Sequence, residues 1–322
     1  MTAVLSFVGS LFLTILLMLI LLPILRNKHV GQRILEIGPN WHKSKEGTPT
    51  MGGLSFSLAI LAVGGLLLIP LALQGADVRR PLLVLIFAAA NGAVGTVDDL
   101  AKLRKKKNEG LLPWQKLLLQ TVFCAAFLAL MRLYGDSTVL VLPFGLAALK
   151  LGPFYYLLAM LFLLGSINFV NLTDGIDGLA TSISMILGVY FATVGFLTSN
   201  APLFLLGSAM FGGCFGFLFF NANPAKVFMG DTGSLFLGGM ITGSAFLSER
   251  PVLLLSAGAL FYLEGLSVIL QVLFFKWKRK RLFRMAPFHH HLEKGGWSEK
   301  KIVAVFSAIT AIAAALTVPA IL

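Results

Sequence analysis

Residues 154–178 read FYYLLAMLFLLGSINFVNLTDGIDG. The first part, 154–170, is a long apolar run, whereas the last eight positions carry Asn171, Asp174 and Asp177. A transmembrane helix needs about 20 mostly apolar residues. Carboxylates at the edge of such a run are costly and usually have a function. The stretch therefore predicts a membrane helix that ends in a functional polar loop.

The same pattern recurs along the chain, which predicts an all-α integral membrane protein. Of the 322 residues, 57% are hydrophobic and only 12% charged, about half the charge usual in a soluble domain. Spans of about 20 residues leave no room for a second, soluble domain, so residues 1–322 form a single polytopic domain. The first run lacks the features of a cleavable signal peptide. The ten expected transmembrane helices are 4–25, 51–73, 81–97, 115–134, 154–170, 179–198, 202–219, 233–248, 251–275 and 302–322.

The distribution of basic residues predicts the topology. Of the 26 Lys and Arg residues, 21 lie in alternate connections, and the opposite connections hold only Arg79, Arg80, Arg132, Lys150 and Arg250. By the positive-inside rule, both termini are extracytoplasmic. The net charge of +12 then reflects loops beside an anionic leaflet and needs no nucleic-acid partner. The loops expected on the cytoplasmic face, with the active site, are 26–50, 98–116, 171–178, 220–232 and 276–301.

Three acidic segments border these loops. Asp98 and Asp99 end the third run, and adjacent helical residues point about 100° apart. One of them is therefore expected to reach the site while Asp98 pairs with Lys102, four positions on. The alternative is a solvated helix end, although carboxylates oppose the helix dipole there.

The second and third acidic segments suit a magnesium site. The loop 168–178 combines two Asp-Gly pairs with two Asn residues, and such oxygen-only ligands favour Mg²⁺ over zinc. Asp231 begins the eighth run, where free N–H groups are expected to be capped by Asp231 and Ser234 and to attract phosphate. The alternatives are an ordinary turn at 168–178 and a plain helix cap at Asp231.

Two further polar segments are less specific. Residues 285–293, MAPFHHHLE, contain three histidines, which suit donation to phosphate better than zinc binding because consecutive side chains do not converge on one ion. Residues 42–53, HKSKEGTPTMGG, offer Lys45, Thr48 and Thr50 to phosphate or simply lead into a helix. Glu264, in the middle of the ninth run, is either functional or a buried hydrogen-bonding residue. That run is long enough to be broken or strongly tilted, and Cys124 and Cys214 are interpreted as apolar packing residues.

Taken together, these segments resemble the polyprenyl-phosphate sugar-1-phosphate transferase superfamily. Asp98-Asp99, residues 168–178 and residues 228–231 (FMGD) are similar to features shared across it. Residues 47–53 (GTPTMGG) and 287–291 (PFHHH) resemble its phospho-N-acetylmuramoyl-pentapeptide transferase branch. The similarity covers nearly the whole chain.

The resemblance implies a reaction and its residues. UDP-N-acetylmuramoyl-pentapeptide and undecaprenyl phosphate would give lipid I and UMP in peptidoglycan biosynthesis, with Mg²⁺ as cofactor, at the cytoplasmic face of a bacterial plasma membrane. The family also suggests a homodimer. The implied metal ligands are Asp231 and Asn171, and the implied catalytic residues are Asp98, Asp99, Asp231 and His290. The implied substrate-binding residues are Lys45, Thr50, Lys102, Lys116, Asn171, Asp174, Gly175, Ile176, Asp177, Asn221, Phe228, His289 and His291.

Alternatives remain for mechanism and for function. The lipid phosphate attacks the β-phosphorus directly, or an Asp first forms a phosphoryl intermediate. The direct route is favoured because a phosphate monoester, with a second pKa near 6, is already mostly dianionic at neutral pH. A sister enzyme that transfers N-acetylglucosamine-1-phosphate is the nearest alternative, and the His triplet argues against it. A membrane transporter is disfavoured because the Asp residues lie at one edge rather than at the midplane.

Overall fold

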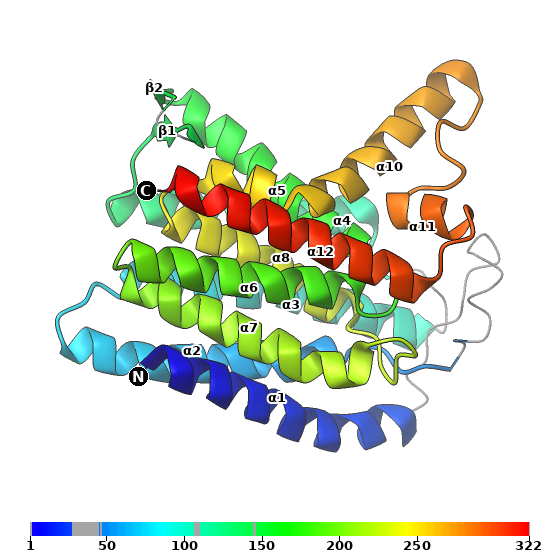
Figure 1. Ribbon diagram of the computed structural model, residues 1–322, viewed down its shortest axis with the longest axis horizontal. Helices are drawn as coiled ribbons and strands as arrows, with labels where there is room; N and C mark the ends of the chain where they lie inside the picture. Colours follow the sequence, from blue (N-terminus) through cyan, green and yellow to red (C-terminus); the bar gives the residue numbers. More distant parts are fainter. Residues whose placement is uncertain (1, 28–44, 46, 106–109, 144–145, 322) are drawn as a thin grey trace.

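The computed structural model describes residues 2–27, 45, 47–105, 110–143 and 146–321. The described chain is a helical bundle whose two ends lie at the same end of the bundle (Figure 1). The elements are α1 (Thr2–Asn27), α2 (Gly53–Leu73), α3 (Arg79–Lys105), α4 (Pro113–Leu133), β1 (Val139–Val141), β2 (Ala148–Lys150), α5 (Phe154–Thr173), α6 (Leu179–Leu197), α7 (Ala201–Asn221), α8 (Gly230–Leu247), η3 (Pro251–Leu253), α9 (Leu254–Ala257), α10 (Ala259–Lys278), α11 (Phe288–Glu293), α12 (Glu299–Thr317) and η4 (Val318–Ala320).

The prediction of a helical membrane protein is confirmed, with two corrections. Within the described residues, nine helices are long and apolar enough to cross a membrane, namely α1 to α7, α10 and α12. The eighth expected span, 233–248, corresponds to α8, which is helical but does not meet that criterion. A short antiparallel hairpin, β1 with β2, also interrupts the connection between α4 and α5 and pairs Val139 with Lys150.

The position of α8 explains the first correction. Every residue of α8 except Asp231 is buried, and its neighbours include α2, α3, α5 and α6. A helix surrounded by protein does not need a lipid-compatible surface, so Ser, Thr and Gly are tolerated and allow close helix packing. The helix that carries Asp231 is thus the centre of the bundle.

The ninth expected run is broken, as its length suggested. It begins as η3 and α9, is interrupted at Gly258, and continues as α10. In Figure 1, α10 leaves the bundle and extends toward the end where α11 lies. Many apolar side chains of its outer half are exposed, among them Leu270, Leu273 and Phe275. The two cysteines are free and buried, which agrees with a packing role.

Candidate active site

A group of three carboxylates joins the end of α3 to the start of α8. Oxygen atoms of Asp98, Asp99 and Asp231 all lie within 4.8 Å of one another. Two lysines complete this group, which we call the Asp231 cluster. The Lys102 ammonium lies 2.7 Å from Asp98 and 3.0 Å from Asp231, and the Lys116 ammonium lies 2.7 Å from Asp231. The predicted pair between Asp98 and Lys102 is therefore present.

The cluster is largely enclosed. The side chains of Asp98 and Asp99 are 4% and 1% exposed, whereas that of Asp231 is 18% exposed. Asp98 is further held by the backbone N–H of Leu111, which donates to its Oδ1 at 2.7 Å. Solvent and a ligand therefore approach along Asp231 and the two lysines.

Asp99 binds the first turn of α8. Its Oδ2 accepts hydrogen bonds from the Thr232 backbone N–H at 2.9 Å and the Thr232 hydroxyl at 2.8 Å, and its Oδ1 accepts from the Asp231 N–H at 3.2 Å. The expectation that Asp231 and Ser234 cap this helix is wrong, because Asp99 from α3 satisfies the free N–H groups instead. Asp99 therefore fixes the position of Asp231.

Two glycines make this contact between α3 and α8 close enough. A Cβ atom on Gly95 of α3 would lie 2.1 Å from the Asp231 carbonyl oxygen. Gly230 has a φ of +71°, a conformation that other residues rarely adopt, and a Cβ there would lie 2.5 Å from Asp99 Oδ2. The approach of the two backbones thus depends on the absence of side chains at both positions.

Asn171, at the end of α5, is oriented by α8. Its amide nitrogen donates to Asp231 Oδ1 at 2.8 Å and to the Ser234 hydroxyl at 2.7 Å. An amide nitrogen does not coordinate a metal ion, so in this arrangement Asn171 supports Asp231 as a hydrogen-bond donor. The role of Asn171 as a second metal ligand stays a prediction.

Asp174 lies in the loop that follows α5. Burial raises the pKa of its carboxyl well above the usual range, and the negative charges of Asp231, Asp99 and Asp177 raise it further. The carboxylates that influence Asp174 thus include members of the Asp231 cluster as well as Asp177, which belongs to a second group of charges.

The second group, which we call the Lys45 cluster, joins three distant segments. The Lys45 ammonium lies 2.7 Å from Asp177 and 2.6 Å from Glu299 at the start of α12. Asn223 donates to both carboxylates, and the Ala225 N–H donates to Asp177 at 3.0 Å. Lys45 and Asp177 were predicted to contact substrate, whereas Asn223 and Glu299 were missed. An acid among the basic residues 276–301 was the available signal for Glu299.

Contacts in the two clusters link all five loops that were predicted to share one face. Lys45, Lys102, Asn171, Asp231 and Glu299 come from or border these five loops. Residues far apart in the chain therefore meet at one end of the bundle. Residues 42–44, the start of the predicted polar segment 42–53, lie outside the described residues.

The first histidine of the triplet is a buried anchor. The triplet lies in α11, where the His289 N–H and Nδ1 each lie 3.1 Å from the carboxylate of Glu264, and both side chains are fully buried. His289 Nε2 has no hydrogen-bond partner and contacts Gly175, where an added Cβ would lie 2.2 Å from it. Glu264 is therefore a buried hydrogen-bonding residue that holds α11 against the loop 174–178.

The other two histidines are held within the same segment. His290 Nδ1 lies 2.5 Å from Glu293, and His291 Nδ1 accepts the Arg284 N–H at 3.1 Å while its ring stacks on Phe288. Their Nδ1 atoms are thus engaged within the chain, so donation to phosphate would fall to Nε2.

The remaining predicted residues line or support the same end of the bundle. The Thr50 hydroxyl is buried without a hydrogen-bond partner, beside Gly230. Asn221 is buried and forms hydrogen bonds with the Thr181 hydroxyl and the Val227 carbonyl, and Ile176 is also buried.

Phe228 is half-buried, and its N–H donates to the Pro49 carbonyl at 2.8 Å. The segment 49–53 thus pairs with 228–229 and supports the start of α8.

The Asp231 cluster has the chemistry of a divalent-cation site that can also attract anions. Its donors are carboxylate oxygens, the ligands that Mg²⁺ prefers, and they carry one more negative charge than the two lysines balance. Added divalent charge would leave the site positive overall and able to bind phosphate groups. The residues therefore fit Mg²⁺.

Two models of known protein families match the chain. The model of glycosyl transferase family 4 matches residues 81–249, which is more than half of the chain. The phospho-N-acetylmuramoyl-pentapeptide-transferase signature 1 matches residues 45–56, which include Lys45, Thr50 and the glycines that pair with the start of α8.

Curated relatives cover almost the whole chain. It is 42% identical to the phospho-N-acetylmuramoyl-pentapeptide-transferase of Halalkalibacterium halodurans over 306 residues, which are 95% of this chain and 92% of the relative. The enzyme of the same name from Clostridium botulinum is 42% identical over 293 residues, covering 91% and 88%. That from Geobacillus kaustophilus is 42% identical over 306 residues, covering 95% and 94%.

Proposed function

Because the chain belongs to the phospho-N-acetylmuramoyl-pentapeptide-transferase family, we propose that it performs the reaction of that family in peptidoglycan biosynthesis. Phospho-N-acetylmuramoyl-pentapeptide is transferred from UDP-N-acetylmuramoyl-pentapeptide to undecaprenyl phosphate, which gives lipid I and UMP. The observation that carries this proposal is the Asp231 cluster, where three carboxylates and two lysines meet at one end of a membrane-type bundle.

Mg²⁺ is the proposed cofactor, held by Asp231 with Asp98, while Asn171 orients Asp231. When bound, the ion neutralises the charge on the phosphate oxygens and so allows two anionic substrates to approach each other. Lys102 and Lys116 add two positive charges at the same place. Asp99 is a positioning residue, because its oxygens are occupied by the first turn of α8.

Direct attack of the lipid phosphate on the β-phosphorus is the proposed route. A phosphate monoester is largely dianionic near neutral pH and needs no strong base. What the reaction needs is electrostatic stabilisation in an enclosed site, and the nearly buried Asp98 and its lysine partners supply fixed charges there. Asp98 then orients the nucleophile through Lys102.

The donor is proposed to lie along the loop 174–178, between the Asp231 cluster and the Lys45 cluster. Asp174, Gly175, Ile176 and Asp177 would contact its nucleoside and pyrophosphate, with Lys45 and the histidines contributing positive charge or N–H donors. His289 contacts Gly175 and would thereby support the loop 174–178 without contacting the donor itself.

The site is proposed to face the cytoplasm of a bacterial plasma membrane. Support comes from the basic loops that converge at this end, because cytoplasmic loops are enriched in Lys and Arg. A nucleotide-linked donor made in the cytoplasm would reach the site from that side, and the lipid acceptor would reach it from the bilayer.

UMP release in detergent tests the proposal. The purified protein is incubated with polyprenyl phosphate, Mg²⁺ and either UDP-N-acetylmuramoyl-pentapeptide or UDP-N-acetylglucosamine. We expect turnover with the first donor only, its loss on chelation of Mg²⁺, and its loss in Asp231→Ala. Preference for the second donor would instead assign the sister transferase reaction. Absence of Mg²⁺-dependent turnover with either donor would reject the enzyme assignment in favour of transport.

A further inference from the structure

A groove between α10 and α11 lies outside the two clusters described above. It has a volume of about 480 Å³ and is formed by the second half of α10, the connection 279–287 and the end of α11. We call it the basic groove, because its lining includes Lys276, Arg281 and Lys294 and contains no Asp or Glu. All three basic residues are exposed, and none of them forms an ion pair with a described carboxylate. The groove therefore has unbalanced positive charge.

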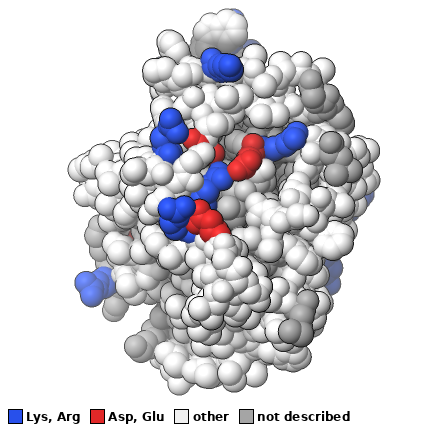
Figure 2. Space-filling view, turned by 90° about the vertical axis from the view of Figure 1, so that its left-hand side faces the viewer, with Lys and Arg blue, Asp and Glu red and all other residues white. Residues whose placement is uncertain are grey.

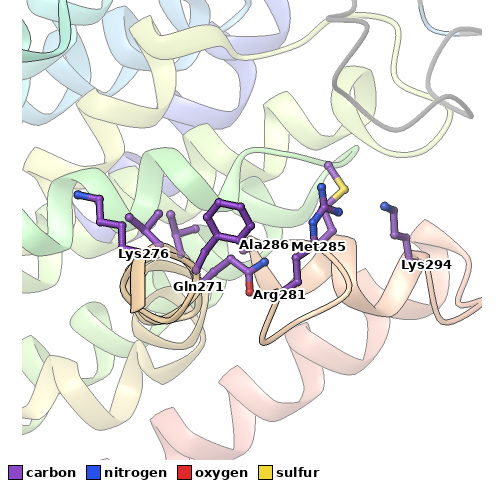
Figure 3. A pocket seen from close by; sticks show the side chains of 9 residues that line it. Gln271, Lys276, Arg281, Met285, Ala286 and Lys294 are labelled. Carbon is purple, nitrogen blue, oxygen red and sulfur yellow. The ribbon is translucent and has the colours of Figure 1, made fainter. Parts of the chain in front are cut away.

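The positive charge is spread along the groove rather than concentrated at one point. Figure 3 shows Lys276 at one end of a row of side chains and Lys294 at the other, with Gln271, Arg281 and Met285 between them. One phosphate group would engage one part of such a row. A chain that carries more than one carboxylate along its length matches the whole row.

The floor of the groove is firmly held. Gln271 of α10 accepts hydrogen bonds from the Leu282 and Phe283 N–H groups at 3.0 and 2.9 Å, which fixes the connection to the helix. Apolar atoms of Val272 and Phe275 lie beside the charges. A rigid wall with mixed apolar and cationic groups is suited to a peptide, whose backbone and carboxylates need both.

The groove is linked to the donor side of the active site through α11. Its lining residue Ala286 leads directly into α11, whose His289 contacts Gly175 in the loop 174–178. A donor that occupies this loop with its nucleotide would extend its other end toward α11. That other end is a peptide, and a peptide with a free C-terminus carries at least one carboxylate.

We propose that the basic groove binds the peptide part of the donor through its carboxylates, by way of Lys276, Arg281 and Lys294. The inference rests on the proposed function, since it concerns the same donor. The competing ligand is a phosphate on a membrane lipid, including that of the acceptor, and the experiment separates the two.

The experiment combines a protein change with a ligand change. The triple variant Lys276→Gln/Arg281→Gln/Lys294→Gln is compared with the wild type, using the natural donor and a donor whose peptide carboxylates are converted to primary amides. The variant Lys278→Gln is the matched control, because Lys278 lies on the same helix but does not line the groove. Far-UV circular dichroism and thermal unfolding check that each variant is folded, and Arg281→Gln alone repeats the test with a single change.

We expect the triple variant to raise the KM of the natural donor about tenfold, as three exposed ion pairs of modest strength would give. The KM of the amidated donor, the KM of polyprenyl phosphate and kcat should change by less than about twofold, and Lys278→Gln should change none of them. An equal rise for both donors, or no rise for either, would refute the inference. A rise confined to polyprenyl phosphate would assign the groove to a lipid phosphate. Failure of the proposed function is distinct, since the wild type would then release no UMP at all.

Discussion

The two ends of the bundle both carry buried or half-buried charges, but they arrange them differently. At the end opposite the active site, Arg80 lies 3.0 Å from Asp136 and 2.8 Å from Glu249, and Arg79 pairs with Asp77. Figure 2 views this end and shows small groups of paired charges on a mostly uncharged surface. The two pairs of Arg80 join α3 to the residues that follow α4 and α8, so they stabilise the packing of these helices.

At the active-site end, carboxylates are gathered instead of being separated. Asp98 and Asp231 share the same two lysines, and Asp99 is satisfied by backbone N–H groups, so acids outnumber bases. Gathering like charges is unfavourable unless a cation or a ligand compensates. The comparison indicates that an excess of buried acid, held by rigid neighbours, distinguishes a binding site from a structural ion pair.

The strongest test of this comparison is neutralisation of one acid at each end. Asp231→Asn should lower UMP release about 10³-fold, because it removes the proposed metal ligand and the partner of two lysines. Asp136→Asn at the opposite end should leave turnover within about twofold, since it only weakens the pair with Arg80. Initial rates at saturating Mg²⁺ measure both. Equal losses in the two variants would contradict the distinction.

A smaller effect is expected where an acid supports the site without joining the reaction. Asp99→Asn should lower turnover about 10- to 100-fold, the usual range for residues that orient metal ligands, and should raise the Mg²⁺ concentration needed for half-maximal rate. Thr232→Val removes only the hydroxyl that donates to Asp99 and should cost less than about threefold, because the backbone donors remain. Mg²⁺ titrations of the two variants give the comparison. If Asp99→Asn matched Asp231→Asn in turnover, Asp99 would be a catalytic residue.

Loss of an ion pair at the end opposite the active site should lower stability and leave turnover almost unchanged. Arg80→Met leaves Asp136 half-buried without its cation and should lower the Tm in detergent by about 3 °C. UMP release at 25 °C should stay within about twofold, because Arg80 lies at the opposite end of α3 from Asp98. Thermal unfolding and initial rates are measured on the same preparation. A large loss of turnover at unchanged Tm would show that the two ends are coupled.

The smallest effect concerns pH and stability at Asp174. Burial raises the pKa of this carboxyl above its ordinary value of 3.8, so the folded protein binds the proton more tightly than the unfolded chain. The folded state therefore loses stability relative to the unfolded state as pH rises above that value. Asp174→Asn removes this loss, so the Tm of the variant minus that of the wild type should grow by about 2 °C between pH 5 and pH 8 without metal. A difference that shrinks with increasing pH would contradict the raised pKa.

Much of the architecture was predictable from the sequence because apolar length is a direct requirement of the bilayer. The runs 154–170 and 202–219 became α5 and α7 nearly as expected. The eighth run was harder to classify, because a helix surrounded by protein has no need of the hydropathy that identifies a span. The break in the ninth run could be expected from its length, but its position at Gly258 depends on packing.

The grouping of several candidate site residues was predictable, and their individual contacts were less so. Asp98, Asp231 and Asn171 could be grouped because they border loops on one predicted face. The capping of α8 by Asp99 was not predictable, since it depends on the close contact at Gly95 between two helices far apart in sequence. The pair of Glu264 and His289 was missed for the same reason. Long-range partners of this kind are determined by packing rather than by local pattern.

The enclosure of α8 has a consequence for how the protein responds to its lipid environment. Asp231 stands at the start of a helix whose other residues all contact protein, so no part of that helix adjusts directly to the thickness of the surrounding hydrocarbon. Peripheral helices such as α1 and α10 can tilt to match thinner or thicker bilayers while the central helix keeps its depth. The depth of Asp231 is thereby insulated from mismatch, and turnover is expected to change little between vesicles of different acyl-chain length.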